Sequence, residues 1–423
     1  MLGDALCSYQ QLFYPRAWEI SVLLESSHRR CEVTVVIPCL NDAETLASYI
    51  EKAHTAMREA GIDGEVVVAD NGSTDRSPEI AISFGARLLS IQRRGYGAAL
   101  MGGFTEAYGR YLIMADGDAS YDFAHVPRFV GALRHGADLV MGNRFKGGIA
   151  PGAMPFLHRY LGNPALSFLG RLIFGAKCGD FYCGMRGLSK DAFERMRLCT
   201  TGMEFASEMV VKATLAGMRV EEVPTTLSPD GRSRAPHLRT WRDGWRGLRF
   251  LFLYSPRWMF FYPGLLLMAL GLGGSLWLLP QRRYIGGISF DVDTLVYALG
   301  AILIGFQVIV FACFAKLYGV MAGLLPRRSW IEKWLRYVTL ERGLVLGALL
   351  TLTGLAAMLY GVQLWRLTGF GELNTSGMLR ITLPSACAMM LGVEVAFASC
   401  FLSILRLGET ESRTRRDHLH DEG

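Results

Sequence analysis

Between Val33 and Phe250 the chain alternates short apolar runs, rich in β-branched residues, with longer stretches of helical periodicity. The short runs predict strands, and the stretches between them predict helices. The expected strands cover residues 33–38, 65–70, 86–90, 111–115 and 138–142, and the expected helices cover residues 43–60, 77–84, 96–108 and 125–134. A strand–helix series of this kind predicts an α/β domain with a mainly parallel sheet covered by helices on both faces.

Four long apolar segments follow, at residues 258–279, 295–321, 344–365 and 381–405. Each has roughly 20 residues or more, which is the length that an α-helix needs to cross a bilayer. The composition agrees, because 51% hydrophobic and 19% charged residues make the chain too apolar for an ordinary soluble protein. We therefore predict an all-α domain of four transmembrane helices after the α/β domain.

Basic residues near the spans predict how these helices are oriented. They occur in the loop between the second and third spans and in the C-terminal tail: Arg327, Arg328, Lys333, Arg336, Arg342, Arg406, Arg413, Arg415 and Arg416. Lysine and arginine in such short segments prefer the cytoplasmic side of a membrane. Since four spans return the chain to the side on which it started, we expect a multi-pass protein of the cell membrane with a cytoplasmic α/β domain.

A second basic region, with arginines and tryptophans between residues 232 and 249, comes just before the first span. It predicts a juxtamembrane amphipathic helix that faces anionic lipid headgroups, and a solvated loop is the alternative. The expected organisation is an N-terminal extension over 1–30, the α/β domain over 31–237, the juxtamembrane helix over 238–257, the spans over 258–407 and a cytosolic tail over 408–423. The extension lacks a basic start followed by an apolar core, so we expect no cleaved signal peptide.

Polar side chains follow three of the predicted strands. Asn41 and Glu44 come after the first strand, Asp70 after the second, and Asp116 and Asp118 after the fourth. Ligands of parallel sheets bind beyond the carboxyl ends of the strands, so these side chains are expected to meet at one crevice. Carboxylates gathered in this way repel one another unless a cation or hydrogen-bond donors compensate their charge.

The tripeptide Asp116-Gly117-Asp118 places two carboxylates on either side of a residue that has no side chain. Both could reach one metal ion while a diphosphate approaches the backbone, and oxygen ligands of this kind suit Mg²⁺ or Mn²⁺. The alternative is an ordinary turn. The sequence Gly95-Tyr96-Gly97-Ala98-Ala99-Leu100 resembles a dinucleotide fingerprint, but it follows the third strand instead of the first, which disfavours a dehydrogenase.

The order of these motifs resembles that of a known family. Pro38-Cys39-Leu40-Asn41-Asp42-Ala43-Glu44, Asp70-Asn71-Gly72-Ser73-Thr74-Asp75, Asp116-Gly117-Asp118 and Gly142-Asn143-Arg144-Phe145 are followed by the membrane spans. Together they resemble the family 2 glycosyltransferases, which have a GT-A nucleotide-diphospho-sugar transferase fold, and most of all their polyprenyl-phosphate members such as dolichyl-phosphate mannose synthase. The resemblance implies inverting transfer of a hexose from a UDP-glucose or GDP-mannose type donor to dolichyl or undecaprenyl phosphate, giving a lipid-linked monosaccharide.

The resemblance also implies roles for residues at the donor side. Pro38, Asn41 and Glu44 would line the nucleotide pocket, and Asp70 would hold the base or the ribose. Asp116 would bind the donor together with Asp118, and both would organise Mg²⁺ or Mn²⁺ on the diphosphate. The third metal ligand stays open, because Ser120 stands where some members have glutamine, and Asp122 is a candidate substitute.

At the acceptor side, the resemblance implies that Arg144, Arg159 and Arg232 hold the lipid phosphate. Asp118 and Arg144 would then be the catalytic residues. A phosphate acceptor is already an oxyanion near neutral pH, so positioning and charge stabilisation would suffice. The segment over residues 152–176 is apolar with interspersed basic residues, which predicts a helix in the plane of the headgroups or, alternatively, a core helix.

Two rival functions use the same fold. A processive polysaccharide synthase would carry a Q-x-x-R-W motif before a pore-forming span, and the sequence has none. A non-catalytic membrane scaffold that binds nucleotide sugars is disfavoured because the carboxylates are retained. The expected partners are therefore a nucleotide-sugar donor, a polyprenyl phosphate and the membrane. No nucleic acid is expected, and homo-oligomerisation through the spans is left open.

Overall fold

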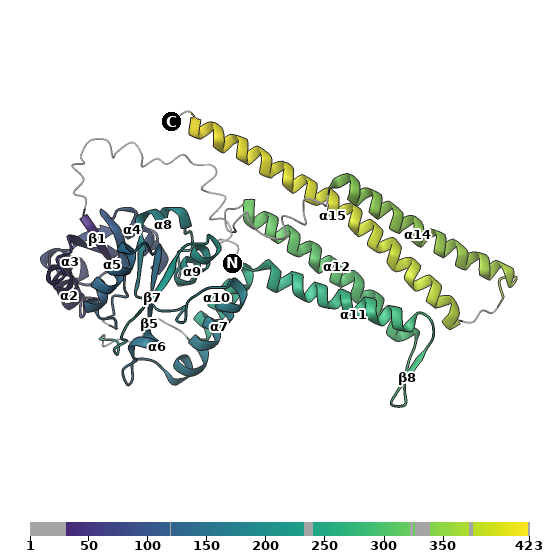
Figure 1. Ribbon diagram of the computed structural model, residues 1–423, viewed down its shortest axis with the longest axis horizontal. Coiled ribbons are helices and arrows are strands. Elements are labelled where there is room, and N and C mark those ends of the chain that lie inside the picture. The colour runs from purple at the N-terminus through teal and green to yellow at the C-terminus, as the bar shows by residue number, and fades with distance from the viewer. Residues whose placement is uncertain are drawn as a thin grey trace. The chain divides into compact units, whose positions relative to one another are not determined.

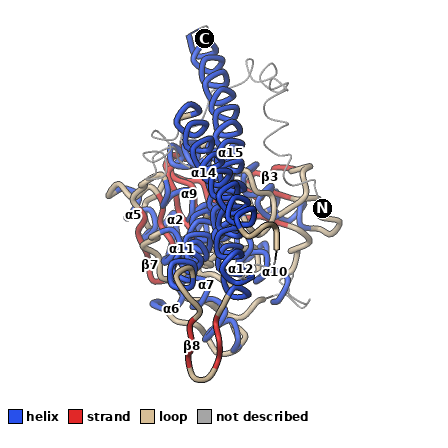
Figure 2. Tube along the Cα trace, turned by 90° about the vertical axis from the view of Figure 1, so that its right-hand side faces the viewer, coloured by secondary structure: helices blue, strands red, loops and turns tan. Residues whose placement is uncertain are grey.

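The computed structural model describes residues 31–118, 120–231, 240–321, 325, 339–371 and 375–421, with the side chains of 240–243 and 407–421 left out of the description. The chain divides into two compact units, Met1–Leu251 and Phe252–Gly423. The first is an α/β unit and the second is built mainly of long helices (Figure 1). Figure 2 shows the same chain coloured by secondary structure, with helices in blue and strands in red.

A seven-stranded sheet forms the centre of the first unit, with the strand order β3-β2-β1-β4-β6-β5-β7. All neighbouring strands are parallel except β6, which runs antiparallel to both β4 and β5. The strands are β1 (Cys31–Cys39), β2 (Gly64–Asp70), β3 (Arg87–Ser90), β4 (Gly109–Met114), β5 (Leu139–Asn143), β6 (Arg186–Ser189) and β7 (Val220–Pro224). The predicted mainly parallel sheet is confirmed, and β6 and β7 are additions to it.

Helices connect the strands and cover the sheet. Those expected from the sequence are α2 (Leu46–Glu59), α3 (Ser77–Ser83), α4 (Tyr96–Thr105) and α5 (Val126–Arg134). The further helical segments are η2 (Phe123–His125), α6 (Arg144–Gly147), η3 (His158–Gly162), α7 (Asn163–Phe174), α8 (Lys190–Met196), α9 (Phe205–Leu215) and α10 (Thr240–Leu253). In α10, a Cβ added to Gly247 would lie 2.9 Å from the Tyr182 hydroxyl, so this helix packs closely against the α/β unit.

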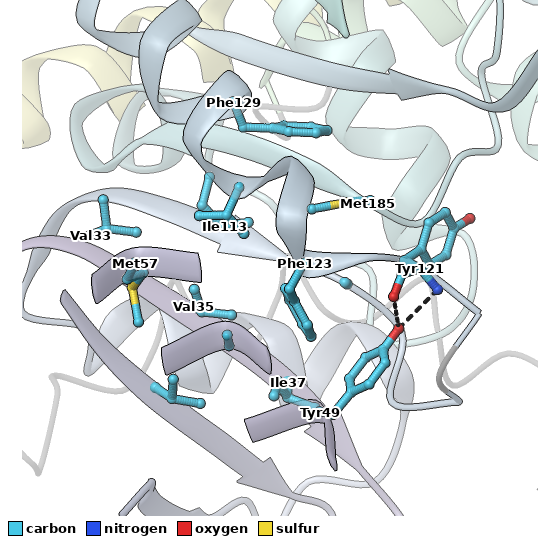
Figure 3. Packing of buried hydrophobic residues seen from close by; sticks show 14 of the residues in the cluster. Val33, Val35, Ile37, Tyr49, Met57, Ile113, Tyr121, Phe123, Phe129 and Met185 are labelled. Atoms are coloured by element: carbon cyan, nitrogen blue, oxygen red, sulfur yellow. Dashed lines mark hydrogen bonds between the residues drawn. The ribbon is translucent and has the colours of Figure 1, made fainter. Parts of the chain in front are cut away.

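The hydrophobic core under β1 also fixes the loop that follows β4. Alternate residues of β1, including Val35 and Ile37, pack with Tyr49 of α2 and Phe123 of η2 (Figure 3). The Tyr49 hydroxyl donates to the Tyr121 carbonyl at 2.8 Å and accepts from the Tyr121 amide at 2.9 Å. A buried hydroxyl therefore holds both backbone groups of one residue just after the Asp-Gly-Asp tripeptide, where an unpaired group would be costly.

Within its described residues, the second unit contains four helices that are long and apolar enough to cross a membrane, over Arg257–Leu278, Val292–Met321, Leu340–Leu367 and Thr375–Arg406. These ranges include η4 (Arg257–Phe261), α11 (Tyr262–Leu278), α12 (Val292–Met321), α14 (Leu340–Leu367) and the first part of α15 (Thr375–Asp421). A small hairpin of β8 (Arg283–Ile285) and β9 (Ile288–Phe290) connects α11 to α12. The four predicted spans are confirmed, whereas the hairpin was not expected.

Candidate active site

Hydrogen bonds join the loops that follow β1 and β2 at the carboxyl edge of the sheet. The Asn71 amide donates to the Cys39 carbonyl at 2.9 Å, and the Asn41 amide donates to Ser73 Oγ at 2.9 Å. The Asn41 side-chain carbonyl in turn accepts from the Thr74 amide at 2.7 Å. Asn41 has a φ of 59°, in the left-handed region that asparagine tolerates better than most residues. Asn41 therefore lies just after β1, where its side chain stabilises the loop after β2.

Asp70 and Asn71 make further hydrogen bonds in the loops at this edge of the sheet. The buried Asp70 carboxylate accepts from the Gly72 amide at 3.1 Å, so it stabilises its own turn. The Asn71 side chain donates to the Arg93 carbonyl at 2.8 Å and accepts from the Gly95 amide at 2.7 Å. Asn71 thus attaches the loop after β3 to the loop after β2. Its position in the Asp70–Asp75 motif did not indicate this role.

The Asp116-Gly117-Asp118 loop is packed tightly against the loop after β1. Thr45 Oγ1 donates to the Gly117 carbonyl at 2.9 Å, and a Cβ added to Gly117 would lie 2.9 Å from the carbonyl oxygen of Pro38. A side chain at this position would push the two loops apart. Asp118 Oδ1 accepts from the Ser120 amide at 3.0 Å and from Ser120 Oγ at 2.5 Å. Ser120 therefore orients the second carboxylate of the pair.

Asp116 has the most perturbed carboxylate of this loop. Burial and then the negative charge of Asp118 raise the pKa of Asp116 from its ordinary value of 3.8 to about 6. The Tyr96 hydroxyl, which donates to Asp116 Oδ1 at 2.7 Å, and the positive charges of Arg144 and Arg186 act in the opposite direction. Two half-buried carboxylates that repel each other therefore lie beside a hydroxyl donor and within range of the charge of two guanidinium groups.

The donor set of this pair fits a divalent cation. Oxygen ligands are those that Mg²⁺ and Mn²⁺ prefer, and a cation would relieve the repulsion that raises the pKa of Asp116. A Cβ added to Gly184 would lie 2.1 Å from Asp116 Oδ2, so glycine at this position leaves the carboxylate its space. The pair could supply two ligands, and phosphate oxygens or waters would complete the coordination, as Mg²⁺ usually requires.

The structure does not place Asp122 with this pair. Its side chain caps η2 by accepting from the Ala124 amide at 3.0 Å, and it lines an outer groove beside Glu51 and Lys52 of α2. In the described part of the chain, no group of three His, Cys, Asp or Glu side chains is arranged to hold a metal ion. The role of Asp122 as third metal ligand therefore stays a prediction, and the contact that the structure gives its side chain is the cap of η2.

Arg144 makes a buried, two-pronged ion pair with Asp180. Its Nε lies 2.7 Å from Asp180 Oδ2 and its Nη2 lies 2.8 Å from Oδ1, while the Arg144 amide also donates to Oδ2 at 3.1 Å. Asp180 is fully buried and Arg144 is 7% exposed. One edge of the guanidinium is thus occupied within the protein, which leaves the other edge for the lipid phosphate that Arg144 is expected to hold.

Arg186 is a second cation inside the unit, with no exposed surface. Its guanidinium donates to the carbonyls of Cys183 at 2.9 Å, Phe181 at 3.2 Å and Ala206. Carbonyl oxygens satisfy its donors, while its charge lowers the pKa of Asp116. Because a buried charge is costly unless compensated, Arg186 and Asp116 stabilise each other electrostatically.

Two protein-family models match the chain. Residues 34–197 match the glycosyl transferase family 2 model, and residues 313–406 match the model for the glycosyltransferase family 2 C-terminal transmembrane region. The low-salt glycan biosynthesis hexosyltransferase Agl6 of Haloferax volcanii is 36% identical over 88% of this chain and 89% of its own length. The chain belongs to glycosyltransferase family 2.

The chain is also similar to two further proteins. The dolichyl-phosphate hexose transferase of Haloferax volcanii is 28% identical to this glycosyltransferase over 46% of the chain and 81% of its own length. A crystal structure of glucosyl-3-phosphoglycerate synthase from Mycobacterium tuberculosis, in complex with Mn²⁺, UDP and glucosyl-3-phosphoglycerate, aligns with a TM-score of 0.39 and 21% identity. That alignment covers 53% of this chain and 78% of the synthase. The matches to the family 2 models and to Agl6 confirm the family resemblance that the motifs indicated.

The remaining predicted site residues of the glycosyltransferase occupy different surroundings. Pro38 lies in β1 beside the Gly117 loop, and Glu44 is exposed just before α2. Arg159 lies on η3 with its guanidinium carbon 5.5 Å from the centre of the Tyr160 ring. Arg232 lies outside the described residues.

Tyr96 is the main residue of this enzyme that the motif analysis missed. It is the first residue of α4, which begins after Gly95, and its hydroxyl reaches across to Asp116. A Cβ added to Gly95 would lie 2.2 Å from the Thr201 carbonyl oxygen, and Gly95 has a φ of 129°. The glycines around Tyr96 were the available signal: they allow a close backbone approach that brings the tyrosine to the carboxylate.

Proposed function

We propose that this glycosyltransferase transfers a hexose, with inversion, from a nucleotide sugar of the UDP-glucose or GDP-mannose type to a polyprenyl phosphate. The observation that carries the donor half is the Asp116–Asp118 pair, in which burial and mutual repulsion raise the pKa of Asp116 to about 6. The relative named as a hexosyltransferase supports transfer of a hexose, and the relative named as a dolichyl-phosphate hexose transferase supports the acceptor half. The product would be a lipid-linked monosaccharide.

In the donor site, Asp116 and Asp118 would hold Mg²⁺ or Mn²⁺ against the diphosphate. The bound cation would neutralise charge on the leaving group. Pro38, Asn41 and Glu44 would line the nucleotide pocket together with Asp70. Because the carbonyl of Asn41 and the carboxylate of Asp70 accept hydrogen bonds from the loop, part of their contribution would be to shape the pocket. Tyr96 would keep one oxygen of Asp116 in a fixed orientation.

At the acceptor side, the lipid phosphate is already an oxyanion, so the protein need not remove a proton from it. Arg144, fixed by Asp180, would provide a stationary positive charge between the donor and the acceptor. Arg159 and Arg232 would approach the headgroup region of the lipid. Attack by the phosphate oxygen on the anomeric carbon, opposite the leaving diphosphate, would form the new sugar–phosphate bond and invert the configuration of the sugar.

The segment of η3 and α7 would bring the lipid to this site. It exposes several large apolar side chains that a water-facing helix would avoid: Phe156 at 78%, Tyr160 at 61%, Leu161 at 62% and Phe168 at 56%. Such a face, with Arg159 and Arg171 beside it, suits the boundary between headgroups and acyl chains. We therefore extend the proposal to membrane contact by this segment, with the α/β unit on the cytoplasmic side.

The decisive test compares sugar transfer by the wild type with that of an Asp118→Asn variant, in membranes supplied with a short polyprenyl phosphate and a panel of labelled nucleotide sugars. Removing one charged ligand should lower transfer by about a hundredfold or more at saturating donor. Asp63→Asn, an exposed aspartate at a distant turn, is the matched control. Asp122→Asn keeps the cap of η2, because asparagine caps helices about as well as aspartate, so undiminished transfer by this variant would exclude Asp122 as the third metal ligand.

Two results would contradict the proposal in different ways. Undiminished transfer by Asp118→Asn would remove the metal assignment. Absence of transfer to any polyprenyl phosphate by the wild type, with intact protein in the membrane, would remove the acceptor assignment.

A further inference from the structure

An open depression of about 300 Å³ lies next to the Arg144–Asp180 pair. It is lined by Asn143, Phe145, Lys146, Pro164, Arg171 and Gly179. These residues come from the end of β5, from α6, from α7 and from the segment before Asp180. Asn143 and Gly179 are the chain neighbours of the two partners of the ion pair, so the depression adjoins the candidate active site.

Two cations line this depression in different electrostatic settings. Lys146 Nζ lies 2.7 Å from Glu222 Oε2, in a pair that leaves the lysine side chain 59% exposed. Glu222 also accepts from the Asn143 side chain at 3.1 Å and from the Gly179 amide, so several donors share its one negative charge. Arg171 is exposed and makes no ion pair within the described residues. The depression thus has a net positive lining with donors available to an anion.

Apolar surface continues from the rim of the depression along α7. Phe168 precedes Arg171 by three positions and Leu172 by four, so it lies on the same side of α7 as both and joins their surfaces. Leu172 is 48% exposed, Phe168 is 56% exposed and Phe145 is 41% exposed. A ligand with an anionic head and a long apolar tail would match the positive depression and the apolar surface that continues from it.

We propose that the depression seats the phosphate group of the lipid acceptor, with Lys146 and Arg171 as its binding cations and with Phe145, Phe168 and Leu172 along the first part of the tail. The proposal rests on the function proposed above and assigns the acceptor phosphate to residues other than Arg144. Arg144 is held by Asp180 through Nε and Nη2, whereas Arg171 can present its planar fork to phosphate oxygens. Arg144 then positions charge between the two substrates.

The test measures the KM for a short polyprenyl phosphate with the full-length protein in phosphatidylcholine nanodiscs. Arg171→Gln and Lys146→Gln are each expected to raise this KM by about tenfold or more, since each removes a charge-assisted contact to phosphate. The KM for the nucleotide sugar and the kcat at saturating acceptor should stay near the wild-type values. Arg171→Lys should recover part of the loss, because it restores the charge without the fork.

Matched controls are Arg128→Gln and Lys177→Gln, which remove exposed cations that do not line the depression. A second set of discs contains added phosphatidylglycerol, so that a seat for the acceptor phosphate is distinguished from a general patch for anionic headgroups. If the depression seats the acceptor phosphate, the Arg171→Gln and Lys146→Gln variants show a raised KM for the acceptor in discs of pure phosphatidylcholine. If the variants differ from the wild type only when phosphatidylglycerol is present, the assignment to the acceptor is overturned.

The failure of this inference differs from a failure of the proposed function. A wild type that transfers sugar to polyprenyl phosphate, together with an Arg171→Gln/Lys146→Gln double variant whose acceptor KM is unchanged, would exclude the seat and leave the function standing. A wild type that uses no polyprenyl phosphate would exclude both.

Discussion

Asp116 is the residue whose surroundings say most about the chemistry of this protein. Its half-buried carboxylate lies next to a second negative charge, and a hydroxyl and two guanidinium groups offset part of the cost. With a pKa raised from 3.8 to about 6, Asp116 makes the metal-free protein lose stability as the pH rises through this interval. A cation that binds the deprotonated pair would reverse that loss. The residue is therefore arranged for a ligand that brings positive charge.

Tyr96→Phe tests this arrangement without changing the ring. Because the hydroxyl of Tyr96 lowers the pKa of Asp116, its removal should raise that pKa further. The acidic limb of Mn²⁺ binding should then move to higher pH, by on the order of one pH unit for a hydrogen bond to a charged group. Titration of Mn²⁺ by calorimetry or by electron paramagnetic resonance across pH 5 to about 8 measures this shift independently of turnover.

Tyr108→Phe is the control for this prediction. The guanidinium carbon of Arg87 lies 4.1 Å from the centre of the Tyr108 ring, and Tyr108 lies away from the carboxylates of Asp116 and Asp118. A Mn²⁺ binding profile that is identical in Tyr96→Phe and in the wild type would show that the hydroxyl does not support Asp116.

At the level of the elements, the helices of the membrane unit pack through glycines. A Cβ added to Gly354 of α14 would lie 2.6 Å from the Ser385 carbonyl oxygen of α15, and one added to Gly264 of α11 would lie 2.8 Å from the Gly305 carbonyl oxygen of α12. Between apolar helices in lipid, close backbone approach is a main source of association. Two tight helix pairs, α11 with α12 and α14 with α15, result from these contacts.

Gly354→Ala should therefore destabilise the membrane unit. The added methyl group meets backbone and Met389 Cγ at 2.6 Å, so α14 and α15 must separate, at a cost of about 1–3 kcal/mol. Thermal unfolding in detergent should show a lower midpoint than the wild type. Gly273→Ala is the matched control, since a Cβ there meets nothing within 4 Å and alanine is the better helix former. Equal midpoints for the two variants would contradict close packing at Gly354.

At the scale of the whole molecule, an α/β enzyme unit is combined with four helices that can span a membrane. An even number of spans and the basic loops predict that the α/β unit and the C-terminal tail share the cytoplasmic side. The β8–β9 hairpin, which connects the first two of these helices, would then face the opposite side.

Cysteine labelling tests this orientation. Ser289→Cys places a thiol on the exposed hairpin, whereas every cysteine in the described part of the chain is buried or half-buried. A membrane-impermeant maleimide added to intact cells should label Ser289→Cys and should label Asp63→Cys only after the membrane is opened. Labelling of Asp63→Cys in intact cells would place the α/β unit outside and contradict the proposal.

Much of this protein could be predicted from local sequence. The strand–helix series and the four spans follow from the spacing of apolar residues, which depends on the geometry of each element alone. The Asp116-Gly117-Asp118 pair could be placed at the carboxyl edge for the same reason, since it directly follows a recognisable strand. The antiparallel strand β6 could not be predicted in this way. Its segment, Arg186–Ser189, is short and has no alternation of polar and apolar residues that indicates its direction.

The tertiary structure alone decided which side chains meet. Tyr96 reaches Asp116 across 20 positions of the chain, and Asp180 takes Arg144 across 36, so neither pair leaves a local pattern. Asp122 is near Asp118 in sequence yet turns to cap η2, because the backbone after Tyr121 is held by the buried Tyr49 hydroxyl. Periodicity thus determines the elements and the edge at which the chemistry gathers. The pairing of charges at that edge depends on packing between distant segments, which only the folded chain establishes.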